Sequence, residues 1–289
     1  MKSGDPAFGP FPFLTSPVGI NPRSGWEGAI GFDLSAAQFS PYHLSGQFRY
    51  GESRRATKSF PANVFIPNPP GFAFTTRTTT ANAAGAGTAE IKENHWLVDF
   101  AVGREFKLGT GQVQAKLGVR FADIRMKISG SGTLSGGDSV TFGFGSPITG
   151  IFSFIQRSHF FGIGPRAGVD GFIPLIGGWT FDYVGGVAVL FGDRTLESSS
   201  TMTLVLNPGF GQTTGTVNTA LRDVDFGAVL NLDAQIGVSY WFNKNFKMSA
   251  SYRFDGYWNA LRTVNLSGAI VNENRFYYGP MLRATLMFP

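Results

Sequence analysis

The clearest pattern in the chain is a strict alternation of apolar and polar residues between Phe246 and Asn259. The apolar positions are Phe246, Met248, Ala250, Tyr252, Phe254, Gly256 and Trp258. A period of two residues predicts a β-strand with two different faces. Strands of soluble sheets usually have about 5–6 residues, whereas a strand that crosses a bilayer needs about 9–11. The pattern therefore predicts a strand long enough to span a membrane.

The same alternation recurs along the chain in pairs of segments joined by short turns. The segment before Phe246, residues 226–240, alternates in the same way, and turn-forming residues at 241–245 connect the two. Further predicted strands cover residues 25–35, 42–55, 96–106, 112–128, 159–173, 179–191 and 275–288. A barrel of this type has an even number of strands. These nine strands therefore predict a tenth, and residues 1–24 are interpreted as an N-terminal extension or the remnant of that missing first strand.

The alternation changes phase once, near Ala122 and Asp123. Before this point the apolar residues occupy odd positions, as at Val119 and Phe121, and after it they occupy even positions, as at Ile124. One extra residue in a strand shifts the alternation in this way. The change of phase predicts a β-bulge.

Four segments between the predicted hairpins are rich in Gly, Ser, Thr, Asn and Pro, and are predicted to be long loops. They cover residues 56–90, 129–155, 192–223 and 261–274. Short turns at one end and long loops at the other are typical of the periplasmic and extracellular ends of an outer-membrane barrel. Because a rigid scaffold often presents function on its loops, these loops are candidate contact surfaces for neighbouring proteins or lipopolysaccharide.

Composition agrees with a barrel in lipid. Charged residues make up 15% of the chain, aromatic residues make up another 15%, and there are 39 glycines and no cysteine. A soluble domain has about 25% charged residues. No run of about 18 apolar residues occurs, so a transmembrane helix is excluded. The sequence predicts an all-β protein, a single antiparallel transmembrane β-barrel of about ten strands, over residues 25–289 in the bacterial outer membrane.

Three short motifs resemble a known family. Residues 161–168 (FGIGPRAG), 232–238 (LDAQIGV) and 278–284 (YGPMLRA) are similar to strands of the Legionella-type pore-forming outer-membrane protein family. The resemblance implies an outer-membrane barrel with pore-forming activity. It implies no catalytic residue.

The polar face of the predicted strands carries charges of both signs. We expect this face to line the interior of the barrel, with Arg49, Asp99, Lys116, Arg120, Arg166, Asp170, Asp182, Asp233, Arg253, Asp255 and Arg283 as the lining charges. Eight strands leave an interior that side chains just fill. The charges predict either a plug of ion pairs or a narrow path for small solutes and ions.

Aromatic residues gather near the predicted strand ends. They are Trp26, Trp96, Trp179, Tyr240, Trp241, Trp258, Tyr278 and Phe288. Aromatic girdles occupy both membrane interfaces of such barrels, so we interpret these side chains as membrane-interface residues.

Two functions follow as expectations. The first is a passive pore for small solutes or ions through the charge-lined interior. The second is a structural or surface barrel with a plugged interior. Catalytic and metal-binding motifs are not evident, so we predict that the protein is not an enzyme and needs no cofactor. The expected partners are the lipid bilayer, lipopolysaccharide, the export and barrel-assembly machinery and neighbouring proteins, and not nucleic acid.

Overall fold

The computed structural model describes residues 23–35, 42–67, 80–109, 111–138, 147–206, 212–243, 246–264 and 269–286, and these form ten strands. The strands are β1 (Arg23–Ser35), β2 (Tyr42–Arg54), β3 (Ala56–Pro67), β4 (Thr80–Leu108), β5 (Gly111–Asp138), β6 (Pro147–Pro174), β7 (Trp179–Leu206), β8 (Thr213–Asn243), β9 (Phe246–Val264) and β10 (Ile270–Leu286). A short 3₁₀ turn at Ile176–Gly178 joins β6 to β7. None of the described segments is a helix long and apolar enough to cross a membrane.

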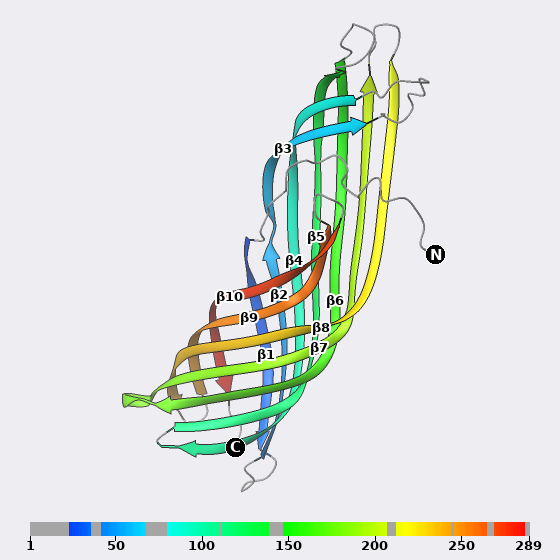
Figure 1. Ribbon diagram of the computed structural model, residues 1–289. Coiled ribbons are helices and arrows are strands. Elements are labelled where there is room, and N and C mark those ends of the chain that lie inside the picture. Colours follow the sequence, from blue (N-terminus) through cyan, green and yellow to red (C-terminus); the bar gives the residue numbers. More distant parts are fainter. Residues whose placement is uncertain are drawn as a thin grey trace.

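All ten strands belong to one antiparallel sheet, which confirms the predicted all-β class and a total of about ten strands. The tenth strand is β3, in a segment predicted to be a loop, and residues 1–22, where a first strand was predicted, lie outside the described residues. The order in the sheet is β1-β2-β4-β5-β6-β7-β8-β9-β10 (Figure 1). Strand β3 follows β2 after Arg55 and pairs with the next part of β4, so β2 and β3 act as one bent strand. Strands β1 and β10 are the two edges, and over the described residues they do not pair with each other.

The sheet is rolled, because side chains meet between strands that are not neighbours in it. Arg49 of β2 donates to Asp255 of β9 at 2.6 Å, and Arg120 of β5 donates to Asp233 of β8 at 2.8 Å. These contacts define an inner face. The other side is the outer face, where alternate residues such as Leu117 are exposed to the surroundings. The sequence alternation therefore separates an apolar outside from a charged inside.

The apolar outer face covers only the lower part of the long strands. On β5 it extends from Val113 to Phe121, about nine residues, which at about 3.3 Å per residue and a tilt of about 40° gives the ~25 Å apolar band of an outer-membrane barrel. Beyond this band the outer face becomes polar on five neighbouring strands. The last apolar and first polar outer residues are Trp96 and Asn94 on β4, Phe121 and Asp123 on β5, Phe161 and His159 on β6, Phe191 and Asp193 on β7, and Val224 and Arg222 on β8.

The upper parts of β3 to β8, which we call the extension, have the opposite polarity. Their inner residues, such as Ile124, Met126 and Phe160, are buried, and their outer residues, such as Lys127, are exposed. The pairing of β5 with β4 and β6 runs through residues 122 and 123 without a shift. The predicted β-bulge is therefore wrong. The apolar residues change position because the environment changes from lipid outside to protein inside, while the strand itself continues regularly.

The extension also corrects the four predicted long loops. Strand β3 and the start of β4 occupy most of 56–90, and β5 and β6 occupy most of 129–155. Likewise, β7 and β8 reach far into 192–223, and β9 and β10 cover much of 261–274. Gly, Ser and Thr here form polar strands outside the apolar band rather than loops. Figure 1 shows β5 to β8 continuing well beyond the level of β9 and β10.

A row of glycines marks the level where the sheet passes from the band to the extension. Gly162, Gly192 and Gly227 are cross-strand partners on β6, β7 and β8. A Cβ atom on Gly192 would lie 2.0 Å from the carbonyl oxygen of Phe161. Only glycine permits this close approach of neighbouring backbones.

The hairpin formed by β9 and β10 folds into the barrel. Pairing between β8 and β9 ends at Leu230 and Trp258, and the next residue, Asn259, has φ of 61°. Asn tolerates this left-handed conformation better than most residues. Beyond it, Ala260 and Leu261 are completely buried against inner residues of the other strands. The described upper part of this hairpin, residues 259–264 and 269–275, is called the inner hairpin below.

Candidate functional site

The candidate site is the interior of the barrel, and its centre is Arg120. This side chain is fully buried. Its Nε and Nη2 atoms donate to the two carboxylate oxygens of Asp99 at 2.6 and 2.7 Å, a bidentate pair. Its Nη1 atom donates to Asp233 at 2.8 Å and also to Asn231. Strands β4, β5 and β8 are thereby tied together across the interior.

A second group of ion pairs extends this layer toward the edge strands. Arg49, also fully buried, donates to Asp255, and Arg253 donates to the same carboxylate at 2.7 Å. Arg166 reaches Asp233 at 3.0 Å. We call these charges, with Asp99 and Arg120, the charged layer. Positive and negative groups alternate within it, so each charge removed from water has an opposite partner.

The remaining predicted lining charges lie apart from the charged layer. Lys116 pairs with Asp170 at 3.0 Å and with Asp33 at 3.2 Å. Lys247 pairs with Asp182 at 3.0 Å. Arg283 of β10 lies opposite Ser249 of β9 and makes no ion pair with any described residue. The structure thus brings seven of the eleven predicted charges into one network and leaves four outside it.

An apolar layer lies directly above the charged layer. It includes Leu97, Ile124, Phe160, Leu190, Val229, Tyr257 and Leu261, all at most 1% exposed. Leu261 comes from the inner hairpin, Tyr257 from the part of β9 just before it, and the others from β4 to β8. Protein interiors are close-packed, so such a cluster leaves little room for water.

Ion pairs hold the inner hairpin to the wall of the barrel. Arg275 of β10 pairs with Glu93 of β4 at 2.9 Å. Arg262 of β9 pairs with Asp223 of β8, and its backbone amide donates to Ser158 of β6 at 3.0 Å. We call the Arg275 and Arg262 pairs the hairpin latch. The hairpin is therefore fixed to three different strands.

Sequence reasoning missed both the apolar layer and the hairpin latch. It placed residues 261–274 in an extracellular loop, so their inward path was not anticipated. One signal was present, because Ile124, Met126 and Ile128 mark an apolar inner face after residue 122. The change of phase in the alternation near residue 122 therefore reflects the apolar layer.

Most predicted interface aromatics occupy the outer face. Trp26 contacts Tyr50, and Trp96 contacts Phe161, with ring centroids 5.6 and 6.1 Å apart. Trp258 contacts Phe276 at 5.6 Å. Near the short turns, Trp179 packs on Tyr240 at 5.1 Å. Trp241 is the next residue in the chain after Tyr240. Tyr278 of β10 is 70% exposed. Phe288 lies outside the described residues.

Nothing in the described interior resembles a metal centre. Over these residues, no group of three or more His, Asp or Glu side chains is placed to hold a metal ion. On the inner face, His95 forms a hydrogen bond with Glu27, and its Nε2 atom lies 3.0 Å from the Oε2 atom of Glu27. His159 bonds Asp123 on the outer face, at 3.2 Å.

The family comparison decides the class of protein. Residues 37–288, nearly the whole chain, match the family described as Legionella pneumophila major outer membrane protein precursor. The chain belongs to this family. The predicted resemblance is confirmed, and the protein is an outer-membrane β-barrel of the bacterial outer membrane. Neither a curated protein nor a solved structure matches the chain.

Membership of this family explains the polarity of the sheet. An outer-membrane protein has lipid around its lower outer face, which accounts for the exposed Leu117, Ile163 and Ile236. Its strand ends must face water, which accounts for the polar outer face of the extension.

Proposed function

We propose that the protein is a structural or surface barrel with a closed interior, which acts through its extension rather than through a central pore. The observation that carries this proposal is the stacking of two closing layers. The charged layer leaves Arg49 and Arg120 fully buried, and the apolar layer seals the interior above it with Leu261 of the inner hairpin. A water-filled path requires polar groups in contact with solvent, and these groups are not.

Conductance in planar bilayers tests the proposal. Correctly folded protein at high salt is expected to produce no reproducible current steps, because the two layers block the interior. Folding is checked first by the shift in electrophoretic mobility between unheated and boiled samples. Regular steps from the folded wild-type protein would overturn the proposal and favour a passive pore.

A second candidate is a pore that opens when the inner hairpin leaves the interior. It is favoured by the nature of the hairpin latch, since two of its attachments are ion pairs, Arg275 with Glu93 and Arg262 with Asp223. The Arg262–Asp223 pair should weaken with salt, because the Asp223 side chain is 32% exposed, whereas the pair of the buried Glu93 should be screened much less. In this alternative the charged layer is the lining of a narrow path rather than a permanent plug.

A further inference from the structure

We propose that the outer face of the extension binds the sugar-phosphate head of a glycolipid of the outer leaflet, the chemistry of lipopolysaccharide. The proposal rests on the proposed function, in which the extension is the working surface. Two observations carry it independently. One is a row of basic residues across neighbouring strands, and the other is a groove lined by hydroxyl groups next to that row.

The basic row runs across five strands. Lys92, Lys127, Arg157, Glu197 and Arg222 are successive cross-strand partners from β4 to β8. Four of the five are positive. Lys92 pairs with Glu52 at 2.6 Å, and this ammonium lowers the pKa of that carboxyl group. Arg222 pairs with Glu197 at 3.6 Å.

Lys127 and Arg157 lie side by side in the row, between Lys92 on one side and Glu197 on the other. They are exposed, directly opposite each other, and form no ion pair with any described residue. Two carboxylates lie close to this pair, and both already have a partner. Glu197, directly opposite Arg157, pairs with Arg222 at 3.6 Å, and Glu90, diagonal to Lys127, pairs with Arg55 at 3.2 Å. Like charges directly opposite on a sheet repel each other. A phosphate between them would turn this repulsion into two charge-assisted hydrogen bonds.

The height of the row points to a glycolipid. Arg157 lies four residues beyond Phe161 and Lys127 six beyond Phe121, the last apolar outer residues of their strands. At about 3.3 Å per residue and a tilt of about 40°, this places the charges roughly 10–15 Å above the apolar band. The headgroup region of a phospholipid reaches only about 5–7 Å beyond the hydrocarbon. Phosphates carried on sugars reach further out.

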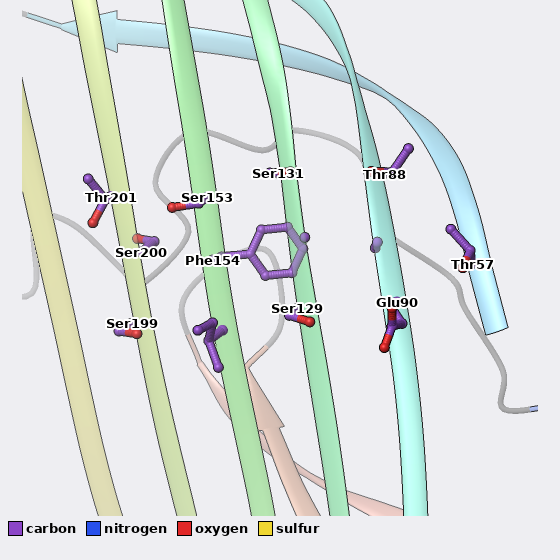
Figure 2. A pocket seen from close by; sticks show the side chains of 13 residues that line it. Thr57, Thr88, Glu90, Ser129, Ser131, Ser153, Phe154, Ser199, Ser200 and Thr201 are labelled. Atoms are coloured by element: carbon purple, nitrogen blue, oxygen red, sulfur yellow. The ribbon is translucent and has the colours of Figure 1, made fainter. Parts of the chain in front are cut away.

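The groove lies immediately beyond the basic row. It has a volume of about 480 Å³ and is shown in Figure 2. Thr88, Ser131, Ser153 and Thr201 stand side by side across β4 to β7, and in the next row Ile155 lies between Ser129 and Ser199. Glu90 also lines it and pairs with Arg55 at 3.2 Å. Hydroxyl groups both donate and accept hydrogen bonds, which suits sugar hydroxyls.

Native mass spectrometry of the folded, detergent-solubilised protein tests the proposal. The probes are lipopolysaccharide, the same lipopolysaccharide with its phosphates removed, and phosphatidylglycerol. Wild-type protein is expected to retain the phosphorylated glycolipid best. The double variant Lys127→Gln/Arg157→Gln should bind it about 10- to 30-fold more weakly, at roughly one kcal/mol for each positive charge near the surface. Arg104→Gln, an exposed arginine at the opposite end of β4, is the matched control.

A second double variant tests the contribution of the groove. Ser131→Val/Ser153→Val should weaken binding of lipopolysaccharide and leave binding of phosphatidylglycerol unchanged. Equal retention of phosphatidylglycerol by the wild type would show a general anion surface and overturn the proposal. Unchanged lipopolysaccharide binding by Lys127→Gln/Arg157→Gln would also overturn it. Neither result bears on bilayer conductance, so failure of the proposed function is detected separately.

Discussion

At the residue scale, the interior depends on one side chain with three acceptors. Arg120 satisfies Asp99 and Asp233, carboxylates that belong to different strands and are at most 6% exposed. Breaking a buried ion pair by removing one partner costs far more than the pair contributes, because the other charge stays buried without compensation. Arg120 therefore stabilises the fold whether or not the barrel conducts solutes.

The variant Arg120→Ala should unfold at a lower urea concentration than the wild type. Asp99 would lose its bidentate partner, whereas Asp233 would keep Arg166 at 3.0 Å, so we expect a loss of about 3 kcal/mol in the free energy of unfolding, the lower end for a broken buried pair. Tryptophan fluorescence in lipid vesicles, followed against urea, measures it. Arg55→Ala is the control, because Arg55 is 68% exposed and its pair with Glu90 should contribute about 0–1 kcal/mol. Equal midpoints for both variants would contradict the structural role of Arg120.

The sequence predicted which charges face inward, but not which of them meet. Alternation alone assigned Arg49, Arg120 and Asp233 to one face, since side chains on a strand point to opposite sides in turn. The contact of Arg49 with Asp255 joins β2 to β9, strands about 200 positions apart in the chain. Such a contact depends on how far the sheet rolls, and alternation carries no information about that.

At the scale of single elements, the glycine row permits a close approach of neighbouring backbones. Replacing Gly192 by Ala would put a Cβ 2.0 Å from the Phe161 carbonyl oxygen and 2.5 Å from the Gly162 Cα. Both are backbone atoms, so a rotamer change cannot relieve the clash. Overpacking of this kind costs about 1–3 kcal/mol.

The matched control for Gly192→Ala is Gly279→Ala. Gly279 also lies within a strand, but an added Cβ would meet nothing within 4 Å. Urea unfolding should therefore show a clear loss of stability for Gly192→Ala and a change within about 0.5 kcal/mol for Gly279→Ala. A similar loss in both variants would mean that the glycine row has no special role.

Strand positions inside the apolar band were predicted well, whereas those beyond it were not. Residues 96–106 and 226–240 alternate between lipid and a charged interior, which produces a strong pattern. Residues 129–138 of β5 read Ser-Gly-Ser-Gly-Thr-Leu-Ser-Gly-Gly-Asp and contain one large apolar residue. Pairing with β4 and β6 stabilises this strand, so tertiary context overrides its low strand propensity.

The inner hairpin gives a prediction that separates the two candidate functions. Leu261→Asp would put a carboxylate into the apolar layer, where Leu261 is completely buried. A charge without a partner there favours expulsion of the hairpin. If the hairpin is a gate, folded Leu261→Asp should conduct in planar bilayers. Leu261→Met, which conserves volume, is the control and should stay closed. Silence from a folded Leu261→Asp barrel would contradict the gated pore.

At the scale of the whole molecule, the barrel consists of two zones with opposite polarity on one continuous set of strands. The lower zone is apolar outside and charged inside, and the extension is polar outside and apolar inside. The last apolar outer residues on β4 to β8 lie within four residues of one another in the cross-strand register. A change of polarity confined to a narrow zone on five strands is expected where strands leave a bilayer, because there all of them pass from lipid into water.

Labels at single cysteines can locate this boundary, because the chain has no cysteine of its own. A fluorophore on Leu117→Cys should be quenched by nitroxide lipids, since Leu117 lies in the apolar band and is 70% exposed. On Ser131→Cys, in the same outer alternation of β5, it should be quenched only by aqueous iodide. The two sites are about 46 Å apart along the strand, roughly 35 Å after tilt, which exceeds the apolar band. Lipid quenching at both would contradict an extension in water and would leave Lys127 and Arg157 below the level at which sugar phosphates could reach them.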